Sequence, residues 1–247
     1  MSFIQDFFRN LFKLLAGFVF VLSFSAFITS LAILNFTDKD NLLPLLTNVF
    51  QTRINQIDNT SLQSVKESFE IACQNSSKVQ QNAFGYNIEF DCSQIDSNFT
   101  FSLAKNIANS IYYAKPDCDF LSCISYNPTY TITESFRSII IYARNISLIL
   151  SIISALAIIA LSKGDFLSRL TAVLVSVIFI CLPVLLIDFI TANLQEQMTD
   201  NLEMTYPIIE NFVDIVKHTF LTFLVGSVVI LLIVLLVRFV FNIGKNK

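Results

Sequence analysis

Four long stretches of uncharged, apolar residues dominate the pattern of this chain. They are residues 14–34, 146–161, 170–187 and 219–237. A bilayer core about 30 Å thick takes roughly 20 helical residues to cross, and the second stretch reaches that length once residues 139–145 are added. The pattern therefore predicts four transmembrane helices.

The polar segment between the first and second stretches carries shorter periodic patterns. Apolar residues at helical spacing predict three helices, over residues 41–57, 61–72 and 99–113. Alternation of apolar and polar residues over 86–92 predicts a short strand. We therefore expect a mainly helical cap domain. Thr131 and Glu134 have the spacing of a capping box, which places the start of the second membrane helix near Thr133.

The apolar faces of the third and fourth helices continue past the predicted membrane. Pro207 stands where a first-turn proline is tolerated, so the fourth helix is expected to begin near it. The large apolar side chains of this helical hairpin need cover, either from the cap or from a neighbouring subunit. The predicted cap–hairpin interface consists of Leu194, Met198, Leu202, Phe212 and Val213.

These patterns predict an all-α membrane protein with four transmembrane helices and a cap between helices 1 and 2. The expected segments are a cytoplasmic lead-in with the first helix (1–37), the extracellular cap (38–132), the second helix (133–162), a cytoplasmic turn (163–169), the third helix with an extension (170–205), and the fourth helix with an extension and a cytoplasmic tail (206–247).

Composition agrees with a membrane protein. Hydrophobic residues make up 54% of the 247 positions, charged residues only 14%, and there are 25 Phe, which is too apolar for an ordinary soluble domain.

The charges are also unevenly placed. Residues 1–13, 162–169 and 238–247 hold seven Lys or Arg against two acids, whereas 35–145 and 188–218 hold nine against seventeen. Basic loops stay in the cytoplasm, so both termini are predicted inside and the cap outside the cell membrane.

Four of the five cysteines fall in the predicted cap, and they are Cys73, Cys92, Cys118 and Cys123. This clustering fits two disulfides in an oxidising compartment. Three pairings are possible, and we favour the two that close locally, Cys73 with Cys92 and Cys118 with Cys123. The fifth cysteine, Cys181, lies inside the third apolar stretch and is expected to serve packing.

The cap also contains glycosylation sequons. The candidate acceptors are Asn59, Asn75 and Asn98. Such triplets are common by chance in an Asn- and Ser-rich chain, so they support an outside location only weakly.

A cleaved signal peptide is the alternative for the first apolar stretch, because Arg9 and Lys13 precede it and Ser30-Leu31-Ala32 resembles a cleavage site. Its uncharged run of 21 residues is longer than a signal-peptide core, which usually spans about 7 to 15 residues. We therefore expect it to remain as a membrane helix.

Motifs for catalysis are scarce. The single histidine, His218, rules out paired-histidine metal motifs, and the five glycines form no phosphate-binding loop. We expect no catalytic site, metal, cofactor or nucleic-acid partner.

Two charges border the apolar stretches at matching depth. Arg144 lies nineteen residues before Lys163, and Asp188 lies nineteen residues after Arg169. At 1.5 Å per helical residue, both are expected about 28 Å from the inner turn. An ion pair between Arg144 and Asp188 would link helices 2 and 3; the alternative is that Arg144 reaches lipid phosphate while Asp188 is hydrated.

Small hydroxyl residues line one face of the first helix and one face of the second. They are Ser23 and Ser30, and Ser147, Ser151 and Ser154. Such faces let membrane helices approach closely, and the alternative is a polar pore wall. In the third helix, Pro183 predicts a kink.

The leading hypothesis is a non-catalytic membrane protein whose extracellular cap binds a protein partner or scaffolds a membrane complex, in contact with the lipid bilayer. The alternative is an oligomeric channel, with copies joined through the cap and hairpin. A channel requires a hydrated path lined by the hydroxyl faces, whereas an assembly protein requires dry, packed helices.

Overall fold

The computed structural model describes residues 2–83, 86–95, 98–115, 122–123, 128–162, 165–187 and 206–245. It is mostly helical and divides into two compact units. Residues Met1–Ile33, Ile140–Gln197 and Val213–Lys247 form one, which we call the helical unit. Leu34–Ile139 and Met198–Phe212 form the other, the disulfide unit.

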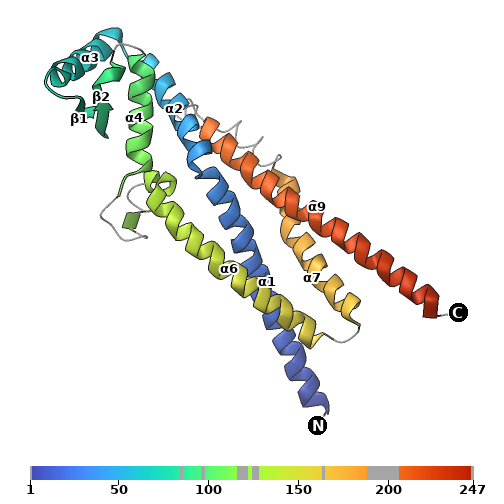
Figure 1. Cartoon of the computed structure of the whole chain (residues 1–247). Coiled ribbons are helices and arrows are strands. Elements are labelled where there is room, and N and C mark those ends of the chain that lie inside the picture. The colour runs from blue at the N-terminus through green and yellow to red at the C-terminus, as the bar shows by residue number, and fades with distance from the viewer. Residues whose placement is uncertain are drawn as a thin grey trace. The chain divides into compact units, whose positions relative to one another are not determined.

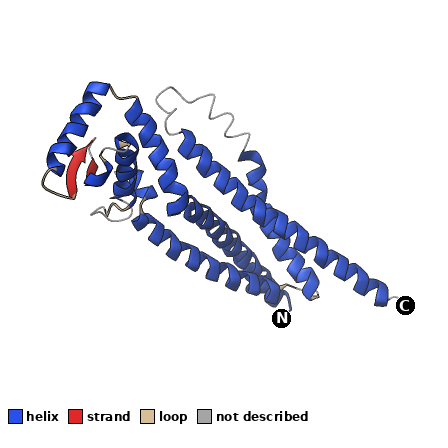
Figure 2. Cartoon of the chain, turned by 45° about the horizontal axis from the view of Figure 1, so that its top comes forward, coloured by secondary structure: helices blue, strands red, loops and turns tan. Residues whose placement is uncertain are grey.

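Four long helices provide the candidate membrane spans (Figures 1 and 2). They are α1 (Ser2–Phe36), α6 (Glu134–Leu161), α7 (Phe166–Cys181) and α9 (Tyr206–Lys245). The segments long and apolar enough to cross a bilayer are Phe7–Phe36, Glu134–Leu161, Phe166–Leu186 and Pro207–Val240. The prediction of four apolar helices is confirmed, and it indicates an integral membrane protein.

Helix α7 ends where the kink was predicted. A 3-10 helix, η3 (Leu182–Leu186), follows Cys181 directly. Pro183 has no backbone N–H and cannot complete the hydrogen bond to Phe179, so the regular α-helical ladder stops here. The extension predicted beyond this point, from residue 188 to 205, lies outside the described residues.

The core of the helical unit draws on all four long helices. Phe20 and Ile28 of α1, Ile158 of α6 and Val177 of α7 are buried together. From α9, Phe223 packs edge-on against Phe24 of α1, with ring centroids 5.8 Å apart. Many other apolar side chains of these helices are exposed, such as Leu236 and Phe239 at 64% each. Exposed apolar surface on this scale fits contact with the lipid bilayer.

The serine faces of α1 and α6 face each other inside the helical unit. Ser151 Oγ donates a hydrogen bond to Ser23 Oγ over 3.1 Å. Both side chains are buried, and so are those of Ser30, Ser147 and Ser154. Small side chains thus allow α1 and α6 to pack closely, which is the first of the two interpretations of the serine faces.

The disulfide unit combines helices with one antiparallel hairpin. Its elements are α2 (Lys39–Asn55), α3 (Asn59–Cys73), β1 (Lys78–Ala83), β2 (Tyr86–Asp91), η1 (Cys92–Gln94), α4 (Phe99–Tyr112) and η2 (Pro128–Ile132). The register pairs Lys78 with Asp91 and Ala83 with Tyr86. The chain is mostly helical, as expected, and the strand predicted over residues 86–92 is β2. Strand β1 was not predicted: the sequence KVQQNA has a single large apolar residue, and only pairing with β2 makes it a strand.

An aromatic cluster forms the centre of the disulfide unit. Phe69 of α3, Phe90 of β2 and Phe99 of α4 pack with ring centroids 5.0 to 6.0 Å apart. Ile88, two residues before Phe90, points to the same buried side, as alternation along a strand requires. The unit therefore has its own hydrophobic core.

The start of α6 differs in detail from the predicted capping box. Thr133, not Thr131, caps the helix, because its Oγ1 accepts a hydrogen bond from the Phe136 N–H over 3.2 Å. Thr131 belongs to η2. The third helical position is thus Phe136 rather than Glu134, so the reciprocal Glu bond of a capping box is not formed.

Candidate functional site

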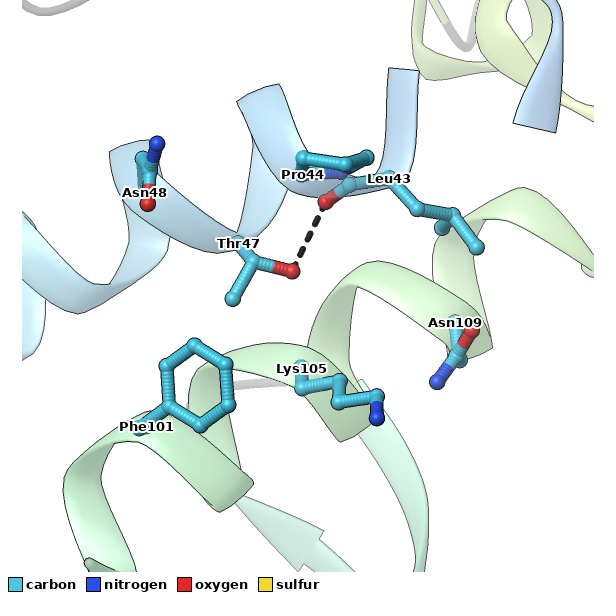
Figure 3. Close-up of a pocket in the computed structure, with 7 residues that line it drawn as sticks. All are labelled: Leu43, Pro44, Thr47, Asn48, Phe101, Lys105 and Asn109. Atoms are coloured by element: carbon cyan, nitrogen blue, oxygen red, sulfur yellow. Dashed lines mark hydrogen bonds between the residues drawn. The ribbon is translucent and has the colours of Figure 1, made fainter. Parts of the chain in front are cut away.

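A shallow groove runs between α2 and α4 on the disulfide unit, with a volume of about 220 Å³. Helix α2 supplies Leu43, Pro44, Thr47 and Asn48 to it, and α4 supplies Phe101, Lys105 and Asn109 (Figure 3). Residues four apart lie on one face of a helix, which explains why these positions line a single groove. Neither helix was predicted to carry a site.

Apolar and polar side chains both line the groove. Thr47 is buried, and its hydroxyl donates to the Leu43 carbonyl over 2.7 Å. Its proton is therefore already hydrogen-bonded within α2. Phe101 is 39% exposed and offers an aromatic surface. Lys105 and Asn48 are exposed beside it. The arrangement can bury an apolar group and hydrogen-bond a polar one.

The groove carries a positive charge, whereas the segment around it, residues 35–145, holds more acidic than basic residues. The seven residues that line it include Lys105 and no carboxylate. At one end, Lys39 and Tyr113 extend the same helical faces by one turn, with the Lys39 ammonium 5.5 Å from the centre of the Tyr113 ring. The hydrogen bond to Tyr113 raises the pKa of Lys39 above its usual value. The groove therefore offers positive charge without an acidic neighbour among its lining residues.

An ion pair joins the start of α2 to the start of α6. Arg137 donates through Nη2 to Asp38 Oδ2 over 2.7 Å. Nearby, the Tyr112 hydroxyl donates to the Thr37 carbonyl over 3.3 Å. Burial raises the pKa of Tyr112, and the Arg137 charge opposes that effect. These contacts hold the end of α4 against the junction between α1 and α2.

One predicted interface residue lies close to this junction. Phe212 of α9 packs edge-on against Phe36 of α1, with ring centroids 5.2 Å apart. Val213 is half-buried. The other predicted interface residues, Leu194, Met198 and Leu202, lie outside the described residues.

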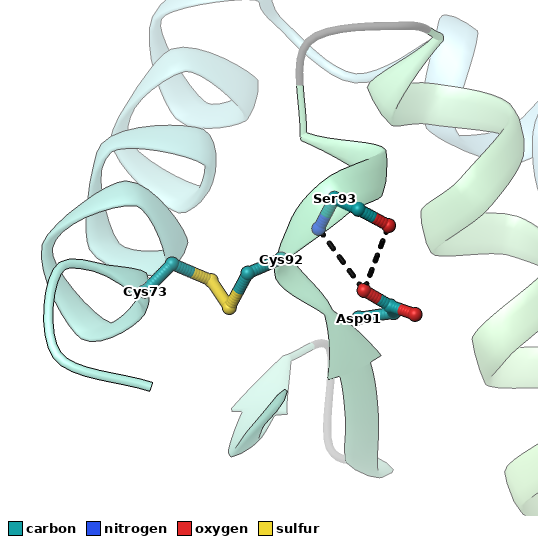
Figure 4. The surroundings of a disulfide bond; sticks show 4 residues. All are labelled: Cys73, Asp91, Cys92 and Ser93. Carbon is teal, nitrogen blue, oxygen red and sulfur yellow. Dashed lines mark hydrogen bonds between the residues drawn. A yellow bond between two sulfur atoms is a disulfide. The ribbon is translucent and has the colours of Figure 1, made fainter. Parts of the chain in front are cut away.

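The Cys73–Cys92 disulfide ties the end of α3 to the end of the hairpin (Figure 4). Beside it, the Asp91 carboxylate accepts hydrogen bonds from the Ser93 N–H at 3.0 Å and the Ser93 hydroxyl at 2.8 Å. These bonds lower the pKa of Asp91. Cys123 is buried and also disulfide-bonded, while Cys118, its predicted partner, lies outside the described residues.

Of the predicted Arg144–Asp188 pair, Asp188 lies outside the described residues. Arg144 donates to its neighbour Asn145, through Nε at 3.1 Å and Nη2 at 2.9 Å. Asp38 and Arg137, which do pair, were not predicted from the sequence. A usable signal was Asp38 itself, since an Asp that precedes a helical pattern is a typical N-cap.

The three sequon asparagines occupy different settings. Asn75 is exposed in the turn between α3 and β1, and Asn98 is exposed just before α4 with a left-handed φ of 119°. Asn59 is the first residue of α3.

No group of three metal-ligating side chains occurs among the residues that the structure describes. His218 stands exposed on α9, away from any such cluster within the described chain. Comparisons of the chain with protein-family models, with curated proteins and with solved structures find no match, so the proposal below depends on the molecule's own geometry.

Proposed function

We propose that this chain is a non-catalytic integral membrane protein whose disulfide unit lies outside the cell and binds a protein partner, or scaffolds a membrane complex, through its surface. The observation that carries this proposal is the groove between α2 and α4. It combines an exposed aromatic ring at Phe101 with the Lys105 ammonium on a folded support. Aromatic residues beside a polar rim are typical of protein interfaces.

The support beneath the groove favours binding over catalysis. Helices α2 and α4 pack on the core that contains Phe69, Phe90 and Phe99, and the Cys73–Cys92 bond closes the hairpin onto α3. A preorganised surface loses little conformational entropy on binding. Such a surface can hold a partner without any motion of the unit.

Site-specific photocrosslinking in cells tests the proposal. A photoreactive phenylalanine analogue would replace Phe101 in the groove and, in a second variant, Ile71 on α3, which is 67% exposed. We expect a discrete crosslinked band from at least one position. A buried-core position, Phe69, serves as the control that should give none. Failure of both exposed positions to crosslink any protein would contradict the proposal.

The alternative of an oligomeric channel has less support. The serines that could line a polar path are buried, and two of them, Ser151 and Ser23, contact each other between α6 and α1. Planar-bilayer recording of the purified protein distinguishes the two functions. Stable unitary conductance would favour the channel.

A further inference from the structure

We propose that the groove between α2 and α4 recognises a short extended peptide segment that presents an apolar side chain and, two positions away, a carboxylate. This inference rests on the proposed function, because it names the chemistry of the partner. The relevant residues are Phe101, Lys105 and Asn109 of α4, with Pro44 and Asn48 of α2 opposite them.

Size indicates a peptide side chain rather than a cofactor. The groove measures about 220 Å³ and is open on one side. Pockets for drug-sized ligands and cofactors span about 300 to 1,000 Å³ and enclose most of the ligand. The smaller, open groove accommodates one or two side chains of a longer segment that continues over the surface.

Charge complementarity indicates a carboxylate. Among the described residues, the ion pairs of the disulfide unit join Lys66 to Glu70, Lys78 to Glu89 and Arg137 to Asp38. Lys105 belongs to none of these pairs, and no acid lines its groove. The Asn109 side-chain amide, one helical turn from Lys105 on α4, adds hydrogen-bond donors on the same side of the groove (Figure 3). An ammonium with an amide donor on the same helical face is a suitable receptor for a carboxylate, since hydrogen bonds between charged groups are the stronger ones.

The apolar requirement comes from Phe101 and Pro44. The exposed ring of Phe101 lies one helical turn from Lys105, a separation of about 6 Å along the helix axis. An extended peptide advances about 3.3 Å per residue, so side chains two positions apart match this separation. The expected motif is therefore an apolar residue and an Asp or Glu two positions apart in an extended segment.

Panning a phage-displayed library of random peptides against the full-length protein in phosphatidylcholine nanodiscs tests the motif. We expect enriched peptides to carry an apolar residue two positions from Asp or Glu. A synthetic copy of the most enriched peptide then serves as the probe for affinity measurements by fluorescence anisotropy. Enrichment of basic peptides, or no enrichment, would overturn the proposal.

Variants of the protein assign the binding to the groove. Lys105→Glu should weaken binding of that peptide about tenfold, because charge reversal removes an attraction and adds a repulsion. Lys105→Arg should retain binding. The matched control is Lys115→Glu, which makes the same charge change at an exposed residue outside the lining set and should leave affinity unchanged. Equal losses in Lys105→Glu and Lys115→Glu would show that net charge, not the groove, is responsible.

Two further measurements keep the result interpretable. Thermal unfolding of Lys105→Glu shows whether the variant folds, and Asn109→Asp, which places a negative charge in the groove by another route, should also weaken binding.

If crosslinking from Ile71 captures a partner that Lys105→Glu does not affect, this inference fails while the proposed function stands. If neither exposed position crosslinks, the proposed function fails as well.

Discussion

Asp38 and Arg137 are 99 residues apart in the sequence, yet the carboxylate of one and the guanidinium of the other lie 2.7 Å apart. Asp38 is also the N-cap of α2, where its side chain accepts a hydrogen bond from the Asp40 N–H over 3.1 Å. Arg137 belongs to the first turn of α6. One carboxylate therefore both starts a helix and anchors a second one.

Disruption of this ion pair should reveal its coupling energy. Asp38→Ala and Arg137→Ala should each destabilise the protein, and the double variant should lose less than the sum. The Arg137 and Asp38 side chains are 31% and 37% exposed, so solvent screening limits the expected coupling to about 1 kcal/mol. Thermal unfolding in detergent measures it. Lys66→Ala with Glu70→Ala, a pair on α3 with a longer separation of 3.5 Å, serves as the control with a smaller coupling; additivity at Asp38 and Arg137 would contradict the prediction.

Tyr112→Phe should lower stability by about 1 kcal/mol, because it removes the hydrogen bond to the Thr37 carbonyl. It should also change the alkaline limb of the stability profile. Burial raises the pKa of Tyr112 in the folded protein, so the stabilising effect of its proton is present below the unfolded pKa and decreases as pH rises above it. Unfolding measured across alkaline pH should therefore show a shallower decrease in Tyr112→Phe than in the parent. The exposed Tyr142→Phe is the control, and an unchanged slope in Tyr112→Phe would count against the interpretation.

Replacement of Cys73 and Cys92 by Ser should reduce the stability of the disulfide unit by about 3 kcal/mol, the value expected for a closed loop of this size. The two cysteines are separated by 19 positions. Reductant should destabilise the parent protein more than this double variant, which retains only the bond of Cys123. Equal sensitivity to reductant would show that the Cys73–Cys92 bond contributes little.

Labelling of intact cells with a membrane-impermeant thiol reagent tests the predicted orientation. If the disulfide unit is outside, Cys73 and Cys92 should become labelled only after external reduction. Labelling that requires permeabilisation would place the unit inside, contrary to the charge pattern. Cys181 is buried among apolar helices and should stay unlabelled in either case.

Close packing of α1 on α6 should depend on the size of Ser151. Ser151→Leu should destabilise the helical unit by about 1 to 3 kcal/mol, because a larger side chain does not fit against Ser23. Ser151→Ala should cost less, about 0.6 kcal/mol, the typical value for a hydrogen bond between membrane helices. Ser176 is on α7 outside this contact, so Ser176→Leu is the size-matched control. Equal melting temperatures for Ser151→Leu and the parent protein would contradict the close packing.

Local patterns in the sequence were sufficient for most of the helices. The apolar stretches became α1, α6, α7 and α9, and the periodic segments of the cap became α2, α3 and α4 with boundaries shifted by only a few residues. These helices could be predicted because helical periodicity and the effects of proline act within a few residues along the chain. Pro183 ended α7 for the same reason.

Tertiary structure alone decided the contacts between segments distant in the sequence. Strand β1 exists because β2 supplies its hydrogen-bond partners, and Val79 is its one large apolar side chain. The ion pair between Asp38 and Arg137 joins residues that no local pattern connects, while the predicted Arg144–Asp188 pair stays a prediction. The α2–α4 groove likewise depends on which helical faces meet, because Phe101 and Lys105 form a common surface with Pro44 only after the two helices pack. The spacing of apolar residues can be seen directly in a sequence. Which strands, charges and helical faces meet depends on how the whole unit buries its apolar surface.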